Sequence, residues 1–501
     1  MASDISKYQS ANGIHRVPLW RIGGFALNNT ATNCYLMFMG YVAYYLGGFV
    51  GMITVLASSF SMIMRLWDGV TDPFIGFLVD KTNSKFGKNR PFMVIGQVIL
   101  FVTSFVLFHV THLLPENVIL RSAFFIVFSM LYYIGYTFQC VVTKSAQSCL
   151  TNDPKQRPMF AVFDAVYNTI LFTGLAIVAA SVAQANSPDP TKVTYVTLGF
   201  FHDMWMIVAI MSAVFTAIAV FSIAPKDRVE FFGTGKPVKV GLKDYWETLK
   251  HNRAIQMLVV AASTDKLATS TKTNAVTAVM FGVVTGAGTL AISAAFQGMT
   301  SVPTVILTML VIGGLATTLG QRKGMIIGSV GGIITSLILA CMWLFGDPTS
   351  MVNSEGGMAM STFTVILIVL TIINNSFNNL SGNIVIPMTA DCADYEVYRT
   401  GKYVPGMMGT LFSFVDKLIS SFAPMIAGIL FAAIGFADIQ PDASAPYSDA
   451  LKYVGIFLMY GMIVLGQICN LVAMKFYPLT KEKMEEIRGE IERIKAEAMK
   501  S

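Results

Sequence analysis

Three charged side chains lie within eight residues of an apolar stretch near the start of the chain: Arg65, Asp68 and Asp72. Asp68 and Asp72 are four residues apart, so on a helix they share one face about one turn apart. A charge inside a membrane costs roughly 2.5–3.5 kcal/mol even on lenient scales, which favours a functional role. Two carboxylates beside the Thr71 hydroxyl suit a hard monovalent cation, and two close carboxylates can equally share a proton.

The same charges permit a structural interpretation, in which Arg65 and Asp68 form an inert ion pair that joins two helices. Two aspartates face a single arginine, however, so one negative charge is left over. Lys417, within a later apolar stretch, is the candidate partner for that charge. The excess carboxylate favours a cation or proton site over an inert pair.

The composition is that of an integral membrane protein. Of 501 residues, 54% are hydrophobic and 13% are charged, whereas about 25% of residues are charged in soluble domains. Mean hydropathy is +0.61. Twelve apolar stretches have the length of membrane helices, about 20 residues each. They cover about 22–47, 51–79, 92–114, 122–149, 160–184, 200–223, 254–284, 289–318, 325–346, 360–388, 406–437 and 450–477.

Lysine and arginine indicate the orientation. If the stretches alternate in direction, 27 of the 35 Lys and Arg residues fall on the side of the two termini, and five lie within stretches. Only Arg121, Lys192 and Lys452 fall on the opposite side. The positive-inside rule therefore places both termini in the cytosol. The net charge of +6 has this topological explanation, so no nucleic-acid partner is indicated.

We expect an all-α integral membrane protein of twelve transmembrane helices in two six-helix bundles, located in the plasma (cytoplasmic or inner) membrane. The expected parts are an N-terminal bundle (1–224), a cytosolic middle loop (225–253), a C-terminal bundle (254–478) and a charged cytosolic tail helix (479–501). The chain carries no His–Glu metal motif, nucleophile elbow or phosphate-binding loop, so neither an enzyme nor an ATP-driven pump is indicated. We expect a monomer whose partners are a small solute and membrane lipid, with no cofactor besides a coupling cation.

Two longer motifs resemble a known family. R-L-W-D-G-V-T-D-P-F-I-G-F-L-V-D-K-T…F-G-K-N-R-P begins at Arg65, and A-D-C-A-D-Y-E-V-Y-R-T-G-K-Y-V-P-G spans 390–406, followed by F-S-F-V-D-K. Both are similar to signatures of the glycoside–pentoside–hexuronide:cation symporters, the branch of the major facilitator superfamily that includes melibiose permease. The order and spacing of the motifs, with twelve stretches, extend the resemblance over nearly the whole chain.

The resemblance implies roles for matching residues. Its cation site, for Na⁺, Li⁺ or H⁺, would contain Asp68 and Asp72 as ligands of the metal ion, with Thr71, Thr137 and Lys417 beside them. The hydroxyls next to the carboxylates favour Na⁺ over H⁺. The resemblance also implies a cytosolic gate of charged residues, which would be Arg157, Asp391, Asp394 and Arg399.

The solute-facing positions depart from the family pattern. Asn29 stands where the family has a sugar-binding aspartate, and Asp164 stands where it has an arginine. Cys140 replaces a further aspartate, and Lys144 replaces a neighbouring aromatic residue. Lys144 and Asp164 could form an exchanged ion pair, or they could fit a charged or zwitterionic solute. The resemblance thus implies a cation site that is largely kept and a solute site that is rewritten.

Other polar groups within the stretches are further solute-binding candidates. Asn375, Asn379 and Asn383 recur every four residues, and such an amide stripe can bind solute hydroxyls or simply join helices. Lys266 is a candidate as well, although a lysine near a helix end can extend to the membrane surface. The candidate solute-binding set is Asn29, Lys144, Asp164, Asn375, Asn379 and Lys266.

From these features we expect a symporter that couples Na⁺ or H⁺ to a sugar, glycoside or related small polar solute by alternating access. Two alternatives remain open, a passive facilitator and a symporter of a charged or zwitterionic non-sugar solute.

Overall fold

Helices make up all the regular structure of the described part of the chain. The structure is a computed structural model, and it describes residues 16–81, 84, 86–151, 156, 158–189, 193–227, 250–354, 356–400, 415, 418–487 and 490. Within these ranges the β-structure amounts to two isolated bridges. Each of the twelve apolar stretches contains helix in its described residues. The prediction of an all-α fold is therefore confirmed.

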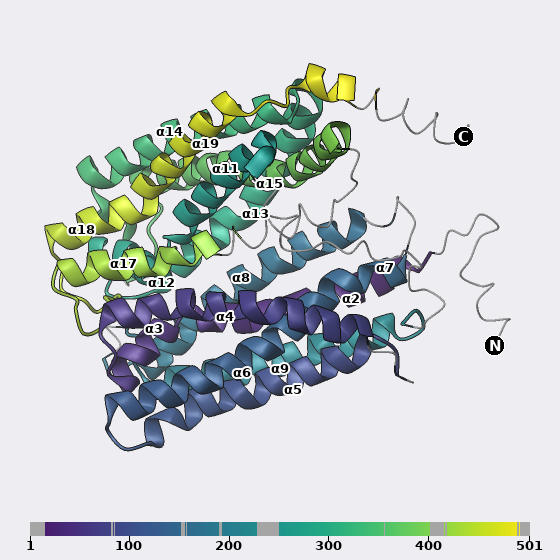
Figure 1. Ribbon diagram of the computed structural model, residues 1–501. Helices are drawn as coiled ribbons and strands as arrows, with labels where there is room; N and C mark the ends of the chain where they lie inside the picture. The colour runs from purple at the N-terminus through teal and green to yellow at the C-terminus, as the bar shows by residue number, and fades with distance from the viewer. Residues whose placement is uncertain are drawn as a thin grey trace. The chain divides into compact units, whose positions relative to one another are not determined.

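Contacts divide the chain into two units. Unit 1 is Met1–Lys236 with Phe436–Gln440, and unit 2 is Pro237–Gly435 with Pro441–Ser501. The helices of unit 1 are α2 (Leu19–Met39), α3 (Val42–Tyr45), η1 (Leu46–Val50), α4 (Thr54–Lys81), α5 (Arg90–His109), η2 (Thr111–Leu113), α6 (Val118–Ser145), α7 (Gln147–Leu150), α8 (Pro158–Asn186) and α9 (Leu198–Ile223). In Figure 1, α5, α6 and α9 run side by side.

Unit 2 is also a bundle of long helices. Its elements are α11 (Arg253–Ser270), α12 (Asn274–Ala278), η4 (Val279–Val284), α13 (Ala291–Leu319), α14 (Gln321–Phe345), η5 (Pro348–Met351), α15 (Thr362–Thr400), α17 (Phe422–Ala433), α18 (Asp449–Ile456), η6 (Phe457–Gly461) and α19 (Met462–Phe476). α15 has 39 residues, which is about 58 Å of helix at 1.5 Å per residue, far more than a bilayer's hydrocarbon core needs.

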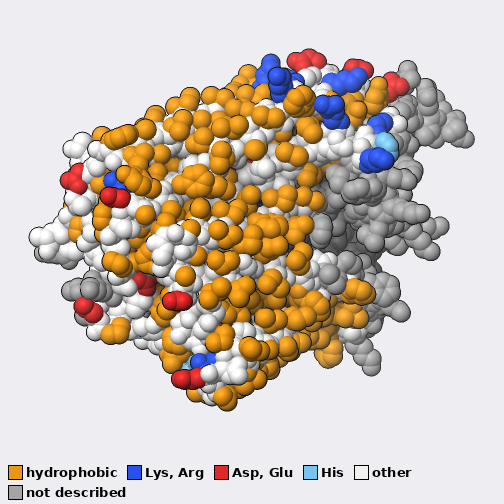
Figure 2. Space-filling model, turned by 60° about the vertical axis from the view of Figure 1, so that its left-hand side comes forward, with side chains coloured by type: hydrophobic (Ala, Val, Ile, Leu, Met, Phe, Trp, Pro, Cys, Tyr) orange, Lys and Arg blue, Asp and Glu red, His pale blue; other side chains and the backbone are white. Residues whose placement is uncertain are grey.

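The outside of the helices is apolar. Eight helices in the described ranges are long and apolar enough to cross a membrane, and Figure 2 shows hydrophobic side chains over most of the face in view. Side chains such as Ile119 and Phe221 are 80% and 72% exposed, respectively. Such an apolar exterior is what a multi-pass membrane protein presents to lipid.

Three long helices, α2, α4 and α11, fall outside those eight. They carry the polar candidates of the sequence, among them Asn29, Asp68 and Lys266. Polar side chains lower the hydropathy of these three helices, whereas the candidates Thr137, Asp164 and Asn375 lie on α6, α8 and α15, which are among the eight.

The start of the C-terminal tail packs into unit 2. Residues 481–487 are helical, and Met484 and Ile487 join the core cluster that includes Leu258 and Met388. The sequence predicts a charged cytosolic helix here. Its apolar side chains Met484 and Ile487 are buried, since they cover the ends of the unit 2 helices.

A five-residue segment between α17 and α18 belongs to unit 1. Within that unit the Thr54 amide donates to the Ala437 carbonyl at 2.7 Å, and Gln440 donates its side-chain amide to the Ser58 hydroxyl. The segment thus completes the hydrogen bonding at the first turn of α4, where helix N–H groups lack partners within the helix.

A buried carboxylate joins the end of α9 to the start of α5. Asp227 is fully buried and accepts hydrogen bonds from the amides of Lys88 (3.2 Å), Asn89 (3.1 Å) and Arg90 (2.9 Å), and from the Asn89 side chain (2.9 Å). Free amides at a helix N-terminus attract an anion. Gly87 has φ +102°, and a Cβ there would collide with the Asp227 carboxylate.

We predict that Asp227→Asn destabilises unit 1, because the new amide group would face backbone N–H donors. Breaking a buried charged contact typically costs about 3 kcal/mol or more. The midpoint of thermal unfolding in detergent should fall clearly. Glu116→Gln, the same change of charge at an exposed loop residue, is the control and should leave the midpoint in place. Equal midpoints for the two variants would contradict the proposed role of Asp227 in joining α9 to α5.

Candidate functional site

The first candidate site is formed by α4 and α6. The Thr137 hydroxyl on α6 donates to Oδ1 of Asp68 on α4 at 2.6 Å. Asp68 is 1% exposed and Thr137 is fully buried. Thr71, one turn after Asp68, is also buried, and its hydroxyl donates to the Asp68 carbonyl at 3.1 Å. The structure thus brings together three of the residues predicted for the cation site.

Packing around this site holds α4 against α6. The indole nitrogen of Trp67 donates to the Met130 carbonyl at 3.0 Å, about two turns along α6 from Thr137. The aromatic ring spans the helix pair next to Asp68. A carboxylate whose neighbours are fixed in this way can present its oxygens with little reorganisation, as a cation site requires.

The remaining predicted members of the cation site stay predictions. Asp72 lies one turn after Asp68 on α4, but its side chain and that of Arg65 are outside the described part. Lys417 is likewise outside the described residues.

The second candidate site is a ladder between α2 and α8. The side-chain amide of Asn29 donates to both carboxylate oxygens of Asp164, at 2.8 and 2.9 Å. One turn on, Asn33 donates to Asn168 at 2.8 Å. Asn168 was missed at the sequence level, although it lies four residues after Asp164. Two of the predicted solute-binding residues, Asn29 and Asp164, are therefore direct partners.

Lys144 is the predicted partner of Asp164 in an exchanged ion pair. Its side chain lies outside the described residues, so the ion pair remains a prediction. In the described part, the Asp164 carboxylate meets the neutral amides of Asn29 and Asn168. Cys140, on the same helix as Lys144, is half-buried.

The asparagines of α15 divide into two rows with different surroundings. Asn374 and Asn378 are buried, whereas Asn375 is half-buried and Asn379 is exposed. The amide of Asn374 donates to Thr335 (2.9 Å) on α14. The α15 row that was predicted to bind solute is thus the row that faces away from the core of unit 2.

The buried row belongs to a network that crosses unit 2. The Gln467 amide on α19 donates to Asp265 on α11 at 2.8 Å, to Asn378 at 3.0 Å and to Ser381 at 3.2 Å. Asn378 in turn donates to Asn374 at 3.1 Å. Gln467 was missed at the sequence level, since one glutamine in an apolar stretch carries no spacing signal. The hydrogen bonds of this row therefore join neighbouring helices of unit 2.

Lys266 lies beside Asp265 on α11 and is exposed. It points out of the core of unit 2, and its role in solute binding remains a prediction.

Of the predicted gate, the structure describes the side chains of Arg399 and Asp391. Arg399 pairs with Glu396 one turn earlier on α15 at 3.0 Å and donates to the His251 carbonyl at 2.7 Å. Buried Glu396 also accepts from Asn252, the N-cap of α11, at 2.8 Å. Glu396 and Asn252 were missed, although the spacing of Glu396 and Arg399 is that of a helix ion pair.

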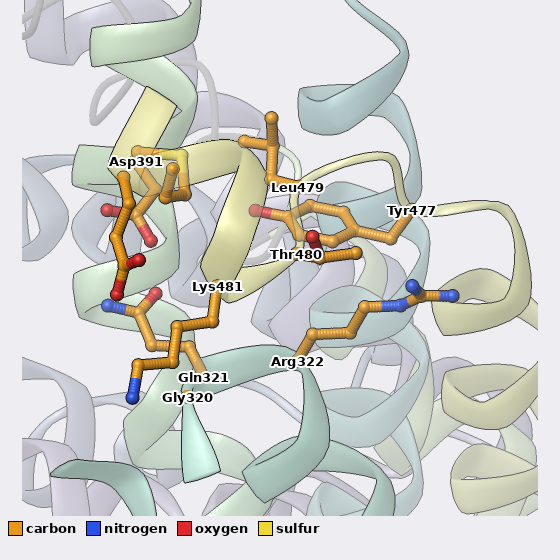
Figure 3. Close-up of a pocket in the computed structure, with 10 residues that line it drawn as sticks. Gly320, Gln321, Arg322, Asp391, Tyr477, Leu479, Thr480 and Lys481 are labelled. Atoms are coloured by element: carbon orange, nitrogen blue, oxygen red, sulfur yellow. The ribbon is translucent and has the colours of Figure 1, made fainter. Parts of the chain in front are cut away.

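Asp391 is buried and lines a small pocket of about 160 Å³ at the end of unit 2. Figure 3 shows Lys481 and Gln321 together at one wall, while the side chain of Arg322 extends away from Asp391. Tyr477 also lines the pocket.

The side chains of Arg157 and Asp394, the other two predicted gate residues, are outside the described part. Their roles in the gate remain predictions.

Comparison with known proteins identifies relatives along nearly the whole chain. The sequence pattern of the MFS/sugar transport protein family matches residues 24–481. The glucuronide carrier protein homolog of Escherichia coli K12 is 22% identical over 480 residues, covering 94% of this chain and 95% of the carrier. The isoprimeverose transporter of Lactiplantibacillus pentosus is 22% identical over 485 residues, or 94% and 92% of the two chains. The putative glycoside/cation symporter YagG of Escherichia coli K12 is 21% identical over 484 residues, or 93% and 94%.

Solved structures share the fold at low identity. The nucleoside transporter NupG superposes with a TM-score of 0.59 and 11% identity, covering 91% of this chain and all of that one. A structure from a study of proton dependent oligopeptide transporters superposes with a TM-score of 0.58 and 12% identity, covering 94% and 99%. These matches confirm the predicted major facilitator fold.

We predict that exchanging the partners of the α2–α8 ladder preserves it. Asn29→Asp alone sets two carboxylates face to face, which should destabilise unit 1 by about 1–3 kcal/mol through like-charge repulsion and a lost hydrogen bond. The double variant Asn29→Asp/Asp164→Asn restores one amide and one carboxylate. Its thermal midpoint at neutral pH should therefore recover most of the loss. A double variant that is as unstable as the single one would contradict the direct pairing.

We also predict that neighbouring asparagines on α15 differ in their effect on stability. Asn378→Leu leaves polar partners in the unit 2 network unsatisfied, at a cost of about 1–3 kcal/mol. Asn379→Leu makes the same change at an exposed position and should keep the unfolding midpoint of the wild type. Thermal unfolding of the two variants in detergent measures the difference, and a reversed order would refute the assignment of the two rows.

Proposed function

Because the chain belongs to the MFS/sugar transport protein family, we propose that it is a cation-coupled symporter of a glycoside or related small polar solute. The family is one of transporters and not of enzymes, in agreement with the sequence. Its members are multi-pass membrane proteins. We place this one in the cytoplasmic membrane. One relative, of Escherichia coli K12, is named the inner membrane symporter YicJ, which supports this location.

One observation carries the proposed coupling: the short hydrogen bond from Thr137 to buried Asp68. A carboxylate in the interior of a membrane bundle costs free energy, so its presence favours a functional role. The hydroxyls of Thr137 and Thr71 add neutral oxygens to the carboxylate oxygens, and hard cations prefer oxygen ligands. Asp72, one helical turn away on α4, would supply the second carboxylate.

The sodium ion is the coupling cation that we favour. A proton needs a carboxylate alone, whereas Na⁺ gains from each additional oxygen ligand. The buried threonine hydroxyls are such ligands, so their presence supports Na⁺ more than H⁺.

The solute class is supported by relatives whose names refer to a glucuronide, a glycoside and isoprimeverose. Asn29, Asp164, Asn375 and Asn379 would hydrogen-bond hydroxyl groups of such a solute. In the proposed cycle, cation binding neutralises the carboxylates and favours the solute-binding state, and alternating access follows. Because the two binding equilibria are linked, the solute should raise the affinity for the cation by the same factor by which the cation raises the affinity for the solute.

The α2–α8 ladder favours a second candidate, a zwitterionic solute. The described partners of Asp164 are the neutral amides of Asn29 and Asn168. An ionised Asp164 would therefore attract a cationic group on the solute. A solute panel that includes glycine betaine beside lactose, isoprimeverose and methyl β-D-glucuronide distinguishes the two candidates.

The test is uptake into proteoliposomes that hold the purified chain, with the panel screened first for thermal stabilisation in the presence and absence of Na⁺. An imposed inward Na⁺ gradient should drive uptake above the external concentration. Uptake that only equilibrates would identify a passive facilitator instead, and uptake driven equally by a pH gradient alone would identify H⁺ as the cation.

We predict that Asp72→Asn abolishes cation-dependent uptake, because one negative charge of the site is lost. Thr137→Ala should weaken Na⁺ dependence by about tenfold, the effect of roughly 1.4 kcal/mol from one lost ligand. Thr137→Ser keeps the hydroxyl and serves as the matched control. Na⁺ titrations of uptake and of thermal stability measure both effects. Sodium-stimulated uptake that is unchanged in Asp72→Asn would refute the assignment.

A further inference from the structure

A groove on the outside of unit 1 runs between α5 and α9. It has a volume of about 490 Å³ and is lined along α5 by Val94 and Val98 and along α9 by Ala213, Ala217 and Val220. Val94 and Val98 are 49% and 55% exposed, respectively. Both helices are long and apolar enough to cross the membrane, so the groove opens toward lipid.

The groove has a fixed floor. Beneath the exposed valines, Oε1 of Gln97 on α5 accepts hydrogen bonds from Ser212 (3.0 Å) and Thr216 (3.1 Å) on α9. All three residues are buried. These bonds hold the two helices together below the surface. The small side chains of Ala213 and Ala217, four residues apart, leave the space above them open.

The length of the groove matches one leaflet of a bilayer. Its lining on the α9 side extends from Ala213 to Ala224, which is about 16 Å at the helical rise of 1.5 Å per residue. Half of a typical hydrocarbon core is about 15 Å. The apolar part of the groove therefore suits a single acyl chain that enters from one membrane surface.

A guanidinium group marks that end of the groove. Arg90, the first residue of α5, lines the groove beside Ala224. Its Nε lies 3.4 Å from Asp227, and its side chain is 24% exposed. Among the residues that the structure describes, its two terminal amino groups have no hydrogen-bond partner. The arginine fork matches the geometry of a phosphate group.

The charges nearby favour an anionic headgroup. None of the residues that line the groove is acidic. The carboxylate of Asp227 is fully buried and accepts hydrogen bonds from three backbone amides at the start of α5. No lining carboxylate is thus available for the ammonium group of a zwitterionic lipid. The positive-inside pattern assigns this end of α5 to the cytosol, where the leaflet is rich in anionic lipid.

We propose that the groove between α5 and α9 is a binding site for one anionic phospholipid, with an acyl chain along Val94, Val98 and Ala217 and its phosphate at Arg90. The lipid would cover the contact of these helices and stabilise unit 1 from outside. This inference is independent of the cation and the solute that the protein carries.

The test uses the full-length chain purified in detergent, with native mass spectrometry to count bound lipids. The probes are palmitoyl-oleoyl phosphatidylglycerol and the matching phosphatidylcholine. Phosphatidylglycerol should bind about fivefold more tightly, the factor expected for one basic residue at a membrane surface. Equal affinity for the two lipids would overturn the proposed headgroup contact.

Two variants locate the site. Ala217→Trp fills the groove from a position that is already exposed, and it should remove one tightly bound phosphatidylglycerol. Val214→Trp places the same ring on the exposed side of α9, at a residue that does not line the groove, and should keep that lipid. If Ala217→Trp does not fold, Ala213→Trp fills the same space. Retention of the lipid in a folded groove-filling variant would overturn the proposal.

The Arg90→Gln variant tests the contact with the headgroup separately from the contact with the acyl chain. It leaves the apolar lining in place and removes the guanidinium group. The preference for phosphatidylglycerol over phosphatidylcholine should then fall to about one, while the chain still binds both lipids weakly. A preference that is unchanged in this variant would rule out Arg90 as the phosphate contact.

Discussion

The fold depends on hydrogen bonds between polar side chains that lie inside the helical bundles. Lipid offers no hydrogen bonds, so such a group is stabilised by a partner on a neighbouring helix. Asp68 accepts from Thr137, and Asp164 accepts from Asn29. These bonds run between helices rather than along them. These candidate site residues therefore also fix the relative positions of α4 and α6, and of α2 and α8.

Unit 2 meets the same need with a network instead of isolated pairs. Gln467 stands between Asp265 and Asn378, which lie on two other helices. Glu396 and Asn252 repeat the arrangement near the end of the unit. The unit 2 network thus extends over four helices, α11, α14, α15 and α19.

The ends of the helices are held by a different kind of contact. Asp227 satisfies the free amides at the start of α5, and residues 436–440 satisfy an amide at the start of α4. Both contacts come from segments far away in the sequence. Such contacts hold the ends of helices together within one unit.

The sequence by itself determined the fold class, the twelve apolar stretches and the family. It also predicted that the hydroxyl groups of Thr71 and Thr137 lie beside Asp68. These follow from local composition and from two long motifs, which are properties of the chain alone. Only the tertiary structure separated Asn374 and Asn378 from Asn375 and Asn379, because a row of amides repeats in the sequence without saying which face is buried. It also supplied the partners Gln467, Asn168 and Glu396, and it buried Met484 and Ile487. Such partners depend on which helices pack together, and a pattern within one helix does not contain that information.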